Sequence, residues 1–345
     1  MELLDFLISG RKLSIFKDGG VFREIALRYS DFDGANGGTW KKYISIPIIE
    51  IPHEDASYIV VIDGSNVYVY SADGVLKTQG VIPGFWENVR SDGLDIRVFD
   101  HNFRQLRFLI VEFDYNSQKA IIAVRLESES EELNVAFGNP FAIKSSYENL
   151  VGKSIGNAFA SEDDVIFFDD FDGDDVDVSE WDIIAGSLGN GNYAVSDSVL
   201  LIHHSPFQIE HKFDPMNRCI VEFRYLYSGI TYFGNLQEVS GVYFGNYIQG
   251  YNQMLLYDTD SGEEYDVGNH YNNIWATLDI VKRSNEVCLY RDGTLIACKP
   301  NTNYVEYIRF GSGANRDCTD MCIDYVKVYK LNDPARFGTP YIGIF

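Results

Sequence analysis

A chain of 345 residues, 46% of them hydrophobic, is too long for one ordinary core and sufficient for two folded domains. Its 51 acidic and 28 basic residues give a formal net charge of -23, which repels phosphate backbones and anionic membrane surfaces. We therefore expect no nucleic-acid partner and no membrane insertion, and no apolar run approaches the length that spans a bilayer.

The residue types predict an all-β fold. The chain has 23 Tyr, 23 Phe and 30 Gly, and its apolar runs are short and end at turn residues, which is typical of strands and hairpins. Clear strand patterns cover residues 43–48, 58–62, 106–113 and 120–126. Long helical periodicity is nearly absent, and the only modest helix candidate lies within residues 145–159. We expect two antiparallel β-modules.

Residues 1–40 are expected to form an extended N-terminal arm that serves as an attachment segment. Residues 11–25 have the pattern of two strands about an Asp-Gly-Gly turn, and a Gly-Gly-Thr-Trp-Lys pattern follows at residues 37–41. This arrangement resembles short segments common in phage tail and virion proteins. A lone arm of this size cannot bury its own apolar face. It therefore packs either on the next module or on another subunit.

Residues 41–145 are expected to form a first β-sandwich domain. The chain has Trp-Lys-Lys-Tyr-Ile at residues 40–44, Asp-Gly-Leu-Asp-Ile-Arg at 92–97 and Phe-Gly-Asn-Pro at 137–140. These segments resemble an uncharacterised β-domain that commonly precedes a lectin-like sandwich. The stretch from residue 146 to residue 164, which ends in acidic residues, is the expected linker.

Residues 165–332 carry a second set of motifs, in a consistent order. Phe-Phe-Asp-Asp-Phe-Asp-Gly stands at residues 167–173, Leu-Tyr-Arg-Asp-Gly-Thr-Leu at 289–295 and Ile-Asp-Tyr-Val-Lys-Val at 323–328. This order is similar to concanavalin A-like lectin/glucanase modules, including laminin-G-like ones. The resemblance implies a two-sheet antiparallel jelly roll. Residues 333–345 remain as a C-terminal tail.

The sequence offers little for catalysis. Hydrolases of the resembled family carry two Glu and one Asp on a single strand, where alternation projects the carboxylates into one cleft. No such run exists in this chain. Glu222 and Asp279 can meet across neighbouring strands, but ordinary ion pairs or solvated edges are the better interpretation. We expect a protein that is not an enzyme and has no catalytic residue.

A structural calcium ion is one interpretation of three acidic residues. Alternation places Asp324 on the same face of its strand as Val326 and Val328, the face expected to be buried. A buried carboxylate needs a partner, and a hard cation such as Ca²⁺ serves. The resemblance implies further ligands near the first strand, at Asp169 and Asp170. The alternative is that Asp324 accepts backbone hydrogen bonds and binds no ion, and the residues favour neither.

Glycan binding would use aromatic rings for stacking and amides for hydrogen bonds. The candidates are the rings in or near the expected concave sheet: Tyr232, Tyr243, Tyr247, Tyr257 and Trp275. The alternative is ordinary packing, because tyrosines are frequent in β-sheets.

The five cysteines all lie in the second half of the chain. Cys288 and Cys298 flank an expected Asp-Gly hairpin turn, which brings them near disulfide range. Cys318 and Cys322 form half of a zinc-site spacing, but no second Cys/His pair accompanies them, so ordinary buried thiols are favoured.

These observations favour a non-catalytic structural and binding protein with a lectin-like module, as a tail or capsid-surface component of a virion. Residues 1–6 lack the basic and apolar regions of a signal peptide, which favours assembly into a particle over secretion. The expected partners are other virion or surface proteins, further copies of the chain and a glycan. The alternatives are a polysaccharide-active enzyme (glycoside hydrolase or lyase) and a cell-surface adhesin. Localisation follows as the virion surface or, alternatively, the cell surface or extracellular space.

Overall fold

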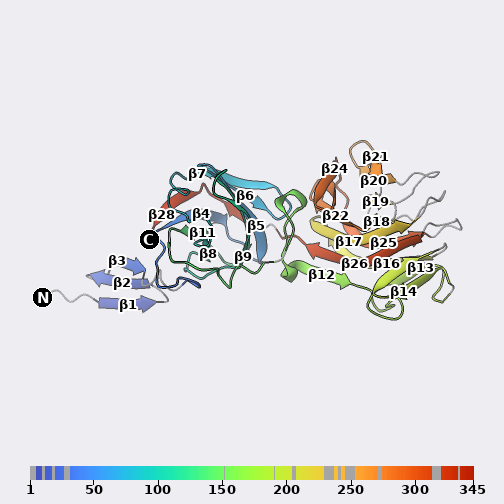
Figure 1. Cartoon of the computed structure of the whole chain (residues 1–345), viewed down its shortest axis with the longest axis horizontal. Helices are drawn as coiled ribbons and strands as arrows, with labels where there is room; N and C mark the ends of the chain where they lie inside the picture. Colours follow the sequence, from blue (N-terminus) through green and yellow to red (C-terminus); the bar gives the residue numbers. More distant parts are fainter. Residues whose placement is uncertain are drawn as a thin grey trace. The chain divides into compact units, whose positions relative to one another are not determined.

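The computed structural model describes residues 5–9, 12–17, 20–26, 32–150, 152–189, 191–203, 207–228, 237–239, 242–244, 253–269, 274–312, 320–332 and 335–345 (Figure 1). The chain divides into two compact units. Unit 1 comprises Met1–Ile155, Phe159–Ser161 and Asn332–Phe345, and unit 2 comprises Gly156–Ala158 and Glu162–Leu331. Among the described residues, no helix is long and apolar enough to cross a membrane.

The predicted all-β class is confirmed. In the described part of the chain the helical residues are confined to two short 3-10 turns, Ile155–Asn157 (η1) and Glu162–Asp164 (η2). The helix candidate within residues 145–159 is therefore wrong except for the single turn η1. Its sequence contains Gly152 and Gly156, which lower helix propensity, and no sustained apolar stripe.

Near the N-terminus, three strands form an antiparallel meander in the order β1-β2-β3. They are β1 (Asp5–Ser9), β2 (Lys12–Lys17) and β3 (Gly20–Ala26). The β2–β3 pair matches the two strands predicted about the Asp-Gly-Gly turn. The sequence pattern did not predict β1, which pairs with β2 along its whole length.

The rest of unit 1 contains two five-stranded antiparallel sheets, ordered β7-β6-β5-β10-β9 and β27-β4-β11-β8, with β28 also paired to β4. Their strands are β4 (Lys42–Glu50), β5 (Ala56–Asp63), β6 (Asn66–Ser71), β7 (Leu76–Val81), β8 (Arg97–Asp100), β9 (Phe108–Asp114), β10 (Lys119–Leu126), β11 (Glu132–Phe137), β27 (Arg336–Phe337) and β28 (Tyr341–Ile344). Alternating residues of both sheets, such as Ile44, Ile46, Tyr58 and Val60, enter one core.

Unit 1 differs from the expected boundaries at both ends. Phe32 and Trp40 are each only 2% exposed and belong to one buried cluster with Phe99, so residues 32–40 pack with the sandwich rather than with an arm. At the other end, β27 and β28 add to β4, so residues 335–345 are part of a sheet rather than a separate tail. The ring of Phe345 lies 4.9 Å from that of Tyr43, which shows how the C-terminal strand is held.

The Asp-Gly-Leu-Asp-Ile-Arg motif has a structural role in unit 1. Asp95 accepts hydrogen bonds from the backbone N–H groups of Arg90 (3.0 Å) and Gly138 (2.7 Å), while its own carbonyl accepts one from Trp40 Nε1 (2.5 Å). The guanidinium of Arg97 is buried and lies 5.1 Å from the centre of the Trp40 ring. These residues join three segments that are distant in the sequence, which explains the motif without a ligand.

Unit 2 is an antiparallel jelly-roll sandwich of two sheets, ordered β14-β15-β26-β17-β22-β23-β24, with β12 paired to β26, and β13-β16-β25-β18-β19-β20-β21. We call the first sheet E and the second sheet F. The strands are β12 (Val165–Asp169), β13 (Asp182–Ala185), β14 (Tyr193–Ser196), β15 (Val199–Ile202), β16 (Phe207–Met216), β17 (Cys219–Ser228), β18 (Gln237–Val239), β19 (Val242–Phe244), β20 (Gln253–Asp258), β21 (Glu263–Asn269), β22 (Ala276–Arg283), β23 (Glu286–Arg291), β24 (Thr294–Pro300), β25 (Val305–Ser312) and β26 (Asp320–Lys330).

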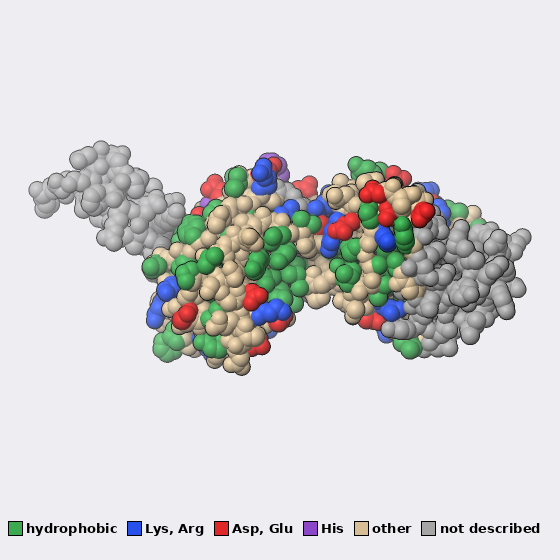
Figure 2. Space-filling view, turned by 90° about the horizontal axis from the view of Figure 1, so that it is seen from above, with side chains coloured by type: hydrophobic (Ala, Val, Ile, Leu, Met, Phe, Trp, Pro, Cys, Tyr) green, Lys and Arg blue, Asp and Glu red, His purple; other side chains and the backbone are tan. Residues whose placement is uncertain are grey.

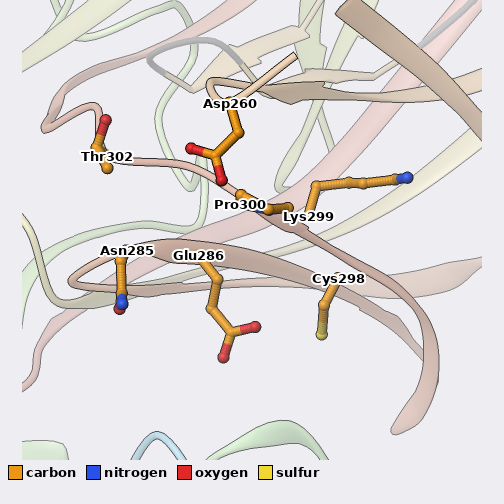
Figure 3. Close-up of a pocket in the computed structure, with 7 residues that line it drawn as sticks. All are labelled: Asp260, Asn285, Glu286, Cys298, Lys299, Pro300 and Thr302. Carbon is orange, nitrogen blue, oxygen red and sulfur yellow. The ribbon is translucent and has the colours of Figure 1, made fainter.

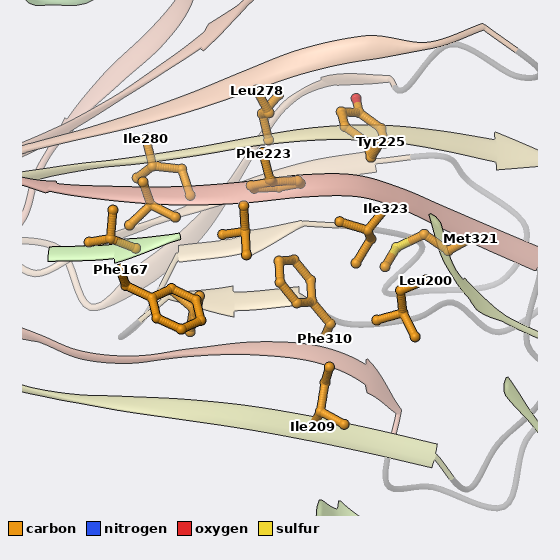
Figure 4. Close-up of a cluster of buried hydrophobic side chains, with 14 of the residues drawn as sticks. Phe167, Leu200, Ile209, Phe223, Tyr225, Leu278, Ile280, Phe310, Met321 and Ile323 are labelled. Atoms are coloured by element: carbon orange, nitrogen blue, oxygen red, sulfur yellow. The ribbon is translucent and has the colours of Figure 1, made fainter. Parts of the chain in front are cut away.

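The core of unit 2 lies between the two sheets. Figure 4 shows Phe223, Leu278 and Ile280 of sheet E among the same buried side chains as Ile209 and Phe310 of sheet F. Because alternate residues of β17 and β22 enter this core, the intervening residues of those strands face the opposite, outer side of sheet E. The outer face of sheet E therefore carries the polar side chains described below.

Charges of both signs are mixed on one face of the described surface. Figure 2 shows Lys and Arg side chains interspersed with Asp and Glu on the face in view. A mixed surface of this kind gives no extended anion-binding patch on that face.

Candidate functional site

The outer face of sheet E carries a polar row across adjacent strands. Lys327 of β26 lies opposite Glu222 of β17, which lies opposite Asp279 of β22, and Asp279 lies opposite Tyr290 of β23. Residues directly opposite on antiparallel strands have neighbouring side chains. The expectation that Glu222 and Asp279 meet across neighbouring strands is therefore confirmed.

Both carboxylates of this row are held by neighbours. Tyr325 donates its hydroxyl proton to Glu222 Oε1 at 2.9 Å, and Asn157 of η1 donates Nδ2–H to Asp279 Oδ2 at 2.9 Å. Burial raises the pKa of Tyr325 well above its ordinary value, and the charge of Glu222 adds to the rise. Asp279 is 2% exposed, so the pair presents one accessible carboxylate and one enclosed one.

Beside this row, Arg224 connects two residues singled out in the sequence. Its guanidinium lies 5.1 Å from the centre of the Trp275 ring, and its Nη1 donates to Asp324 Oδ2 at 2.7 Å. Trp275, just before β22, is half-buried. The pairing fixes one face of the indole against a cation, worth about 0.5–1 kcal/mol at an exposed site.

The predicted glycan-binding rings do not all come together. Trp275 lies next to sheet E, whereas Tyr243 is in β19 and Tyr257 is in β20, both strands of sheet F. For those two tyrosines the structure describes the backbone. Tyr232 and Tyr247 lie outside the described residues.

The predicted position of Asp324 is wrong. β26 has an irregularity where it pairs with β17 near Arg224 and Tyr225, so Ile323, Val326 and Val328 are buried while Asp324 faces outward with a 29% exposed side chain. A β-bulge shifts the alternation by one residue, which reverses the face of the residues beside it. Asp324 is therefore partly exposed and paired with Arg224. The reason for expecting a cation beside it, a carboxylate buried without a partner, does not apply.

Asp169 is the last residue of β12 and pairs in register with Val326 of β26, two residues from Asp324, while Asp170 begins the acidic loop that follows. Asp169 accepts hydrogen bonds from the Phe171 backbone N–H (2.7 Å) and from Trp181 Nε1 (2.6 Å). A cavity of about 260 Å³ lies over this loop, with Asp170 among its lining residues. Asp169 and Asp324 therefore lie on neighbouring strands, but each carboxylate already has protein hydrogen-bond donors.

A larger polar cavity, of about 380 Å³, lies between the ends of β20 and β21 and the β23–β24 hairpin (Figure 3). The residues that line it are Asp260, Asn285, Glu286, Cys298, Lys299, Pro300 and Thr302. They supply carboxylate, amide, hydroxyl and ammonium groups. The sequence motifs did not identify this cavity. Asp260 lies about 25 residues before Asn285, and the sequence around each of them predicts only a turn.

Hydrogen bonds and a disulfide connect the segments that form the walls of the cavity. The Asn301 N–H donates to the Asn285 carbonyl at 2.9 Å, and the Thr259 N–H donates to the Pro300 carbonyl at 3.0 Å. Lys282, which is 2% exposed, donates from Nζ to the Asn301 carbonyl at 2.6 Å. Cys288 and Cys298 form a disulfide across β23 and β24, in agreement with the proximity that the hairpin turn predicted.

Comparison with known proteins gives a family match over part of the chain. A family model described as a domain of unknown function (DUF2341) matches residues 92–184. The match begins at Asp92, the first residue of the motif in unit 1, and extends past Pro140 into the first strands of unit 2. The comparison with curated proteins finds no match.

Solved structures similar to this chain include three glycoside hydrolases. An endo-β-1,3-glucanase from Pyrococcus furiosus is 15% identical, with a TM-score of 0.34, over 49% of this chain and 95% of that chain. The catalytic domain of a laminarinase from Thermotoga petrophila is 13% identical, with a TM-score of 0.35, over 49% and 98%. A family 16 glycosyl hydrolase from Mycobacterium smegmatis is 13% identical, with a TM-score of 0.38, over 48% and 100%. These values assign no active-site residue to this chain, and the comparisons give no support to a phage or virion origin.

Proposed function

We propose that unit 2 is a glycan-binding module whose ligand occupies the polar cavity between β20–β21 and the β23–β24 hairpin. The observation that supports it is the composition of the lining: residues with carboxylate, amide, hydroxyl and ammonium groups border about 380 Å³, a volume within the usual range for small-ligand sites. The hydroxyl groups of a glycan can pair with both donors and acceptors, and the lining has both. The net charge of -23 favours a neutral glycan over an anionic one.

The cavity is also held by fixed bonds. The cavity walls are tied by the Cys288–Cys298 disulfide, by the Asn301–Asn285 backbone bond and by the buried Lys282 ammonium. A preformed site loses less side-chain and loop entropy when a ligand binds. This favours recognition by the existing geometry rather than by closure of a loop.

The cavity supports binding better than hydrolysis. Figure 3 shows the carboxyl group of Glu286 directed away from Asp260, and Glu286 accepts a 2.7 Å hydrogen bond from Arg283. Glycoside hydrolysis requires two carboxyl groups that flank the scissile bond. We therefore keep a non-catalytic function as the leading proposal.

Isothermal titration with neutral oligosaccharides tests this function. Asp260→Ala and Asn285→Ala should each weaken binding about tenfold or more, because each removes hydrogen bonds to the ligand worth about 1.5 kcal/mol. Thr294→Ala, at the exposed opposite end of β24, is the matched control and should leave the affinity unchanged. Binding that persists in both cavity variants would refute the assignment to this site.

A polysaccharide-active enzyme is the second candidate, and the in-register Glu222–Asp279 pair favours it. Its test is the release of reducing ends from β-glucans, with Glu222→Gln as the variant. Turnover that disappears in this variant would replace the binding proposal.

The proposed location is an oxidising surface environment, on a virion or a cell. The Cys288–Cys298 disulfide supports it, because disulfides persist in extracellular, periplasmic and virion-surface settings. Association with other surface proteins and with further copies of the chain belongs to the same proposal.

A further inference from the structure

The β23–β24 hairpin brings three metal-ligating side chains together. Cys288 and Cys298 lie directly opposite each other, and Glu286 precedes Cys288 by two residues, which places it on the same face of β23. One carboxylate oxygen and the two sulfur atoms all lie within 4.8 Å of one another. Two of these groups are joined as a disulfide, so the cluster has a second chemical state in which both sulfurs are thiols.

The bridge can be reached only from the Cys298 side, because Cys288 is fully buried. Cys298 is exposed and lines the large polar cavity together with Glu286, and β24 is the last strand in the order of sheet E. Figure 3 shows the Glu286 and Cys298 side chains extending toward the same side of the hairpin. Exposed disulfides are the ones most readily attacked by an external thiolate.

We propose that reduction of the Cys288–Cys298 bridge creates a binding site for one thiophilic divalent cation such as Zn²⁺, with Glu286 as the third ligand. An external dithiol supplies two electrons and two protons, its own sulfurs become a disulfide, and the bridge becomes two thiols. The cation then displaces the two thiol protons and is held by two thiolates and one carboxylate oxygen. A water molecule from the cavity fills the fourth position.

Once the bridge is open, the two sulfur atoms must move apart before they can hold one metal ion. Ligand atoms around a tetrahedral zinc ion lie about 3.3–3.8 Å apart, given metal–ligand distances of about 2.0–2.3 Å, and the three atoms already lie within 4.8 Å. Arg283 donates to Glu286 Oε1 at 2.7 Å, and Oε2 is the oxygen that we assign to the metal. The cation and the reduced hairpin therefore replace one covalent link between β23 and β24 with a coordinate one.

The other described thiols do not offer an equivalent site. Cys219 is fully buried, and burial raises the pKa of its thiol to about 12, which keeps it protonated. Cys322 is partly buried. Cys318, which lies four residues before it in the sequence, is outside the described residues. A Cys322→Ser variant therefore tests whether the metal is bound by Cys318 and Cys322 instead.

Cobalt titration of the full chain tests the proposal. After reduction with a phosphine and its removal without oxygen, Co²⁺ should bind at one equivalent with a thiolate-to-cobalt charge-transfer band, and Zn²⁺ should displace it. The unreduced chain should show no band. Cys298→Ser should abolish the band, and Glu286→Gln, which keeps both thiols, should weaken Co²⁺ binding about tenfold or more.

Circular dichroism establishes that each variant is folded before titration, and Glu286→Gln carries the test if Cys298→Ser does not fold. Cys322→Ser should bind Co²⁺ like the unchanged chain. A reduced chain without the band, a Glu286→Gln variant with unchanged affinity, or a band lost in Cys322→Ser would each overturn the assignment. Because the readout is cobalt absorption, the result is distinguishable from success or failure of glycan binding.

Discussion

At the residue scale, Lys282 is a lysine enclosed in unit 2. It is 2% exposed, and its Nζ donates to the carbonyls of Arg283 and Asn301 at 2.6 Å each. Burial lowers the pKa of Lys282 from 10.5 to about 8. The folded state therefore binds fewer protons than the unfolded state between these two values, so its stability should rise with pH across that window.

We predict that the free energy of unfolding of unit 2 gains about 2 kcal/mol from Lys282 between pH 7.5 and 9.5. Above about pH 10 the partly buried Tyr325 and the buried Tyr329, whose pKa values are raised chiefly by burial, act in the opposite direction. Urea unfolding at the two pH values measures the gain. Lys282→Met should lose this gain, whereas Lys330→Met, at an exposed position of β26, should keep it.

Single residues also show where alternation in the sequence misleads. The motif Ile-Asp-Tyr-Val-Lys-Val predicted a strand, and β26 is that strand. It did not reveal the bulge that turns Asp324 outward, because a bulge depends on the pairing with β17 rather than on the local sequence. The partner Arg224 stands 100 residues away, a contact that only the register of the sheet establishes.

At the element scale, Arg97 joins strand β8 to two loops of unit 1. Its Nε donates to the Asp33 carbonyl, its Nη2 to the Ile143 carbonyl and its Nη1 to the Ile96 carbonyl, each at 2.6 Å. Asp33 and Ile143 belong to segments that the expected domain boundaries separated. The Arg97 side chain therefore helps to hold residues 32–40 against the sandwich.

Arg97→Met should lower the free energy of unfolding of unit 1 by about 3 kcal/mol, because it leaves several buried carbonyls without their donor. Thermal and urea unfolding, followed by tryptophan fluorescence, measure the loss. Arg336→Met is the matched control: its side chain is 75% exposed and lies 3.8 Å from Glu50, so the expected change is within about 0.5 kcal/mol. A loss below 1 kcal/mol in Arg97→Met would contradict this role.

The acidic loop after β12 is the element in which calcium remains a proposal, now without Asp324. The carboxylates of this loop, including Asp170, line the smaller cavity together with Asp169 at the end of β12. If the loop binds Ca²⁺, a chelator should lower the melting temperature of unit 2 and added Ca²⁺ should restore it by mass action. Asp170→Asn should remove the response. A melting curve that is identical with and without chelator would exclude the ion.

The elements of the candidate cavity were only partly predictable. The Leu-Tyr-Arg-Asp-Gly-Thr-Leu motif predicted the β23–β24 hairpin, and its turn placed Cys288 near Cys298. The opposite wall, at Asp260, comes from the β20–β21 turn in sheet F. Which turns of two different sheets become neighbours depends on sandwich topology, which local periodicity does not encode.

At the scale of the whole molecule, the two-module organisation followed from the order of the motifs, but the ends of unit 1 did not. Trp40 reads as the start of a module, whereas Phe32 lies before it in a Gly-rich segment without strand alternation. Both side chains are buried in the same cluster, so unit 1 includes residues 32–40. The attachment role proposed for the arm is therefore confined to the segment that contains β1, β2 and β3.

Two truncations separate an attachment segment from an integral part of unit 1. Deleting residues 1–26 leaves Phe32 and Trp40 in place, so both units should keep their cooperative melts while assembly with other subunits is lost. Deleting residues 1–40 removes both rings, and loss of Trp40 alone should cost about 3–5 kcal/mol, enough to unfold unit 1. Light scattering reports assembly and thermal melts report folding. If the chain without residues 1–26 has an unfolded unit 1, or if it still assembles as the full chain does, β1–β3 do not serve attachment.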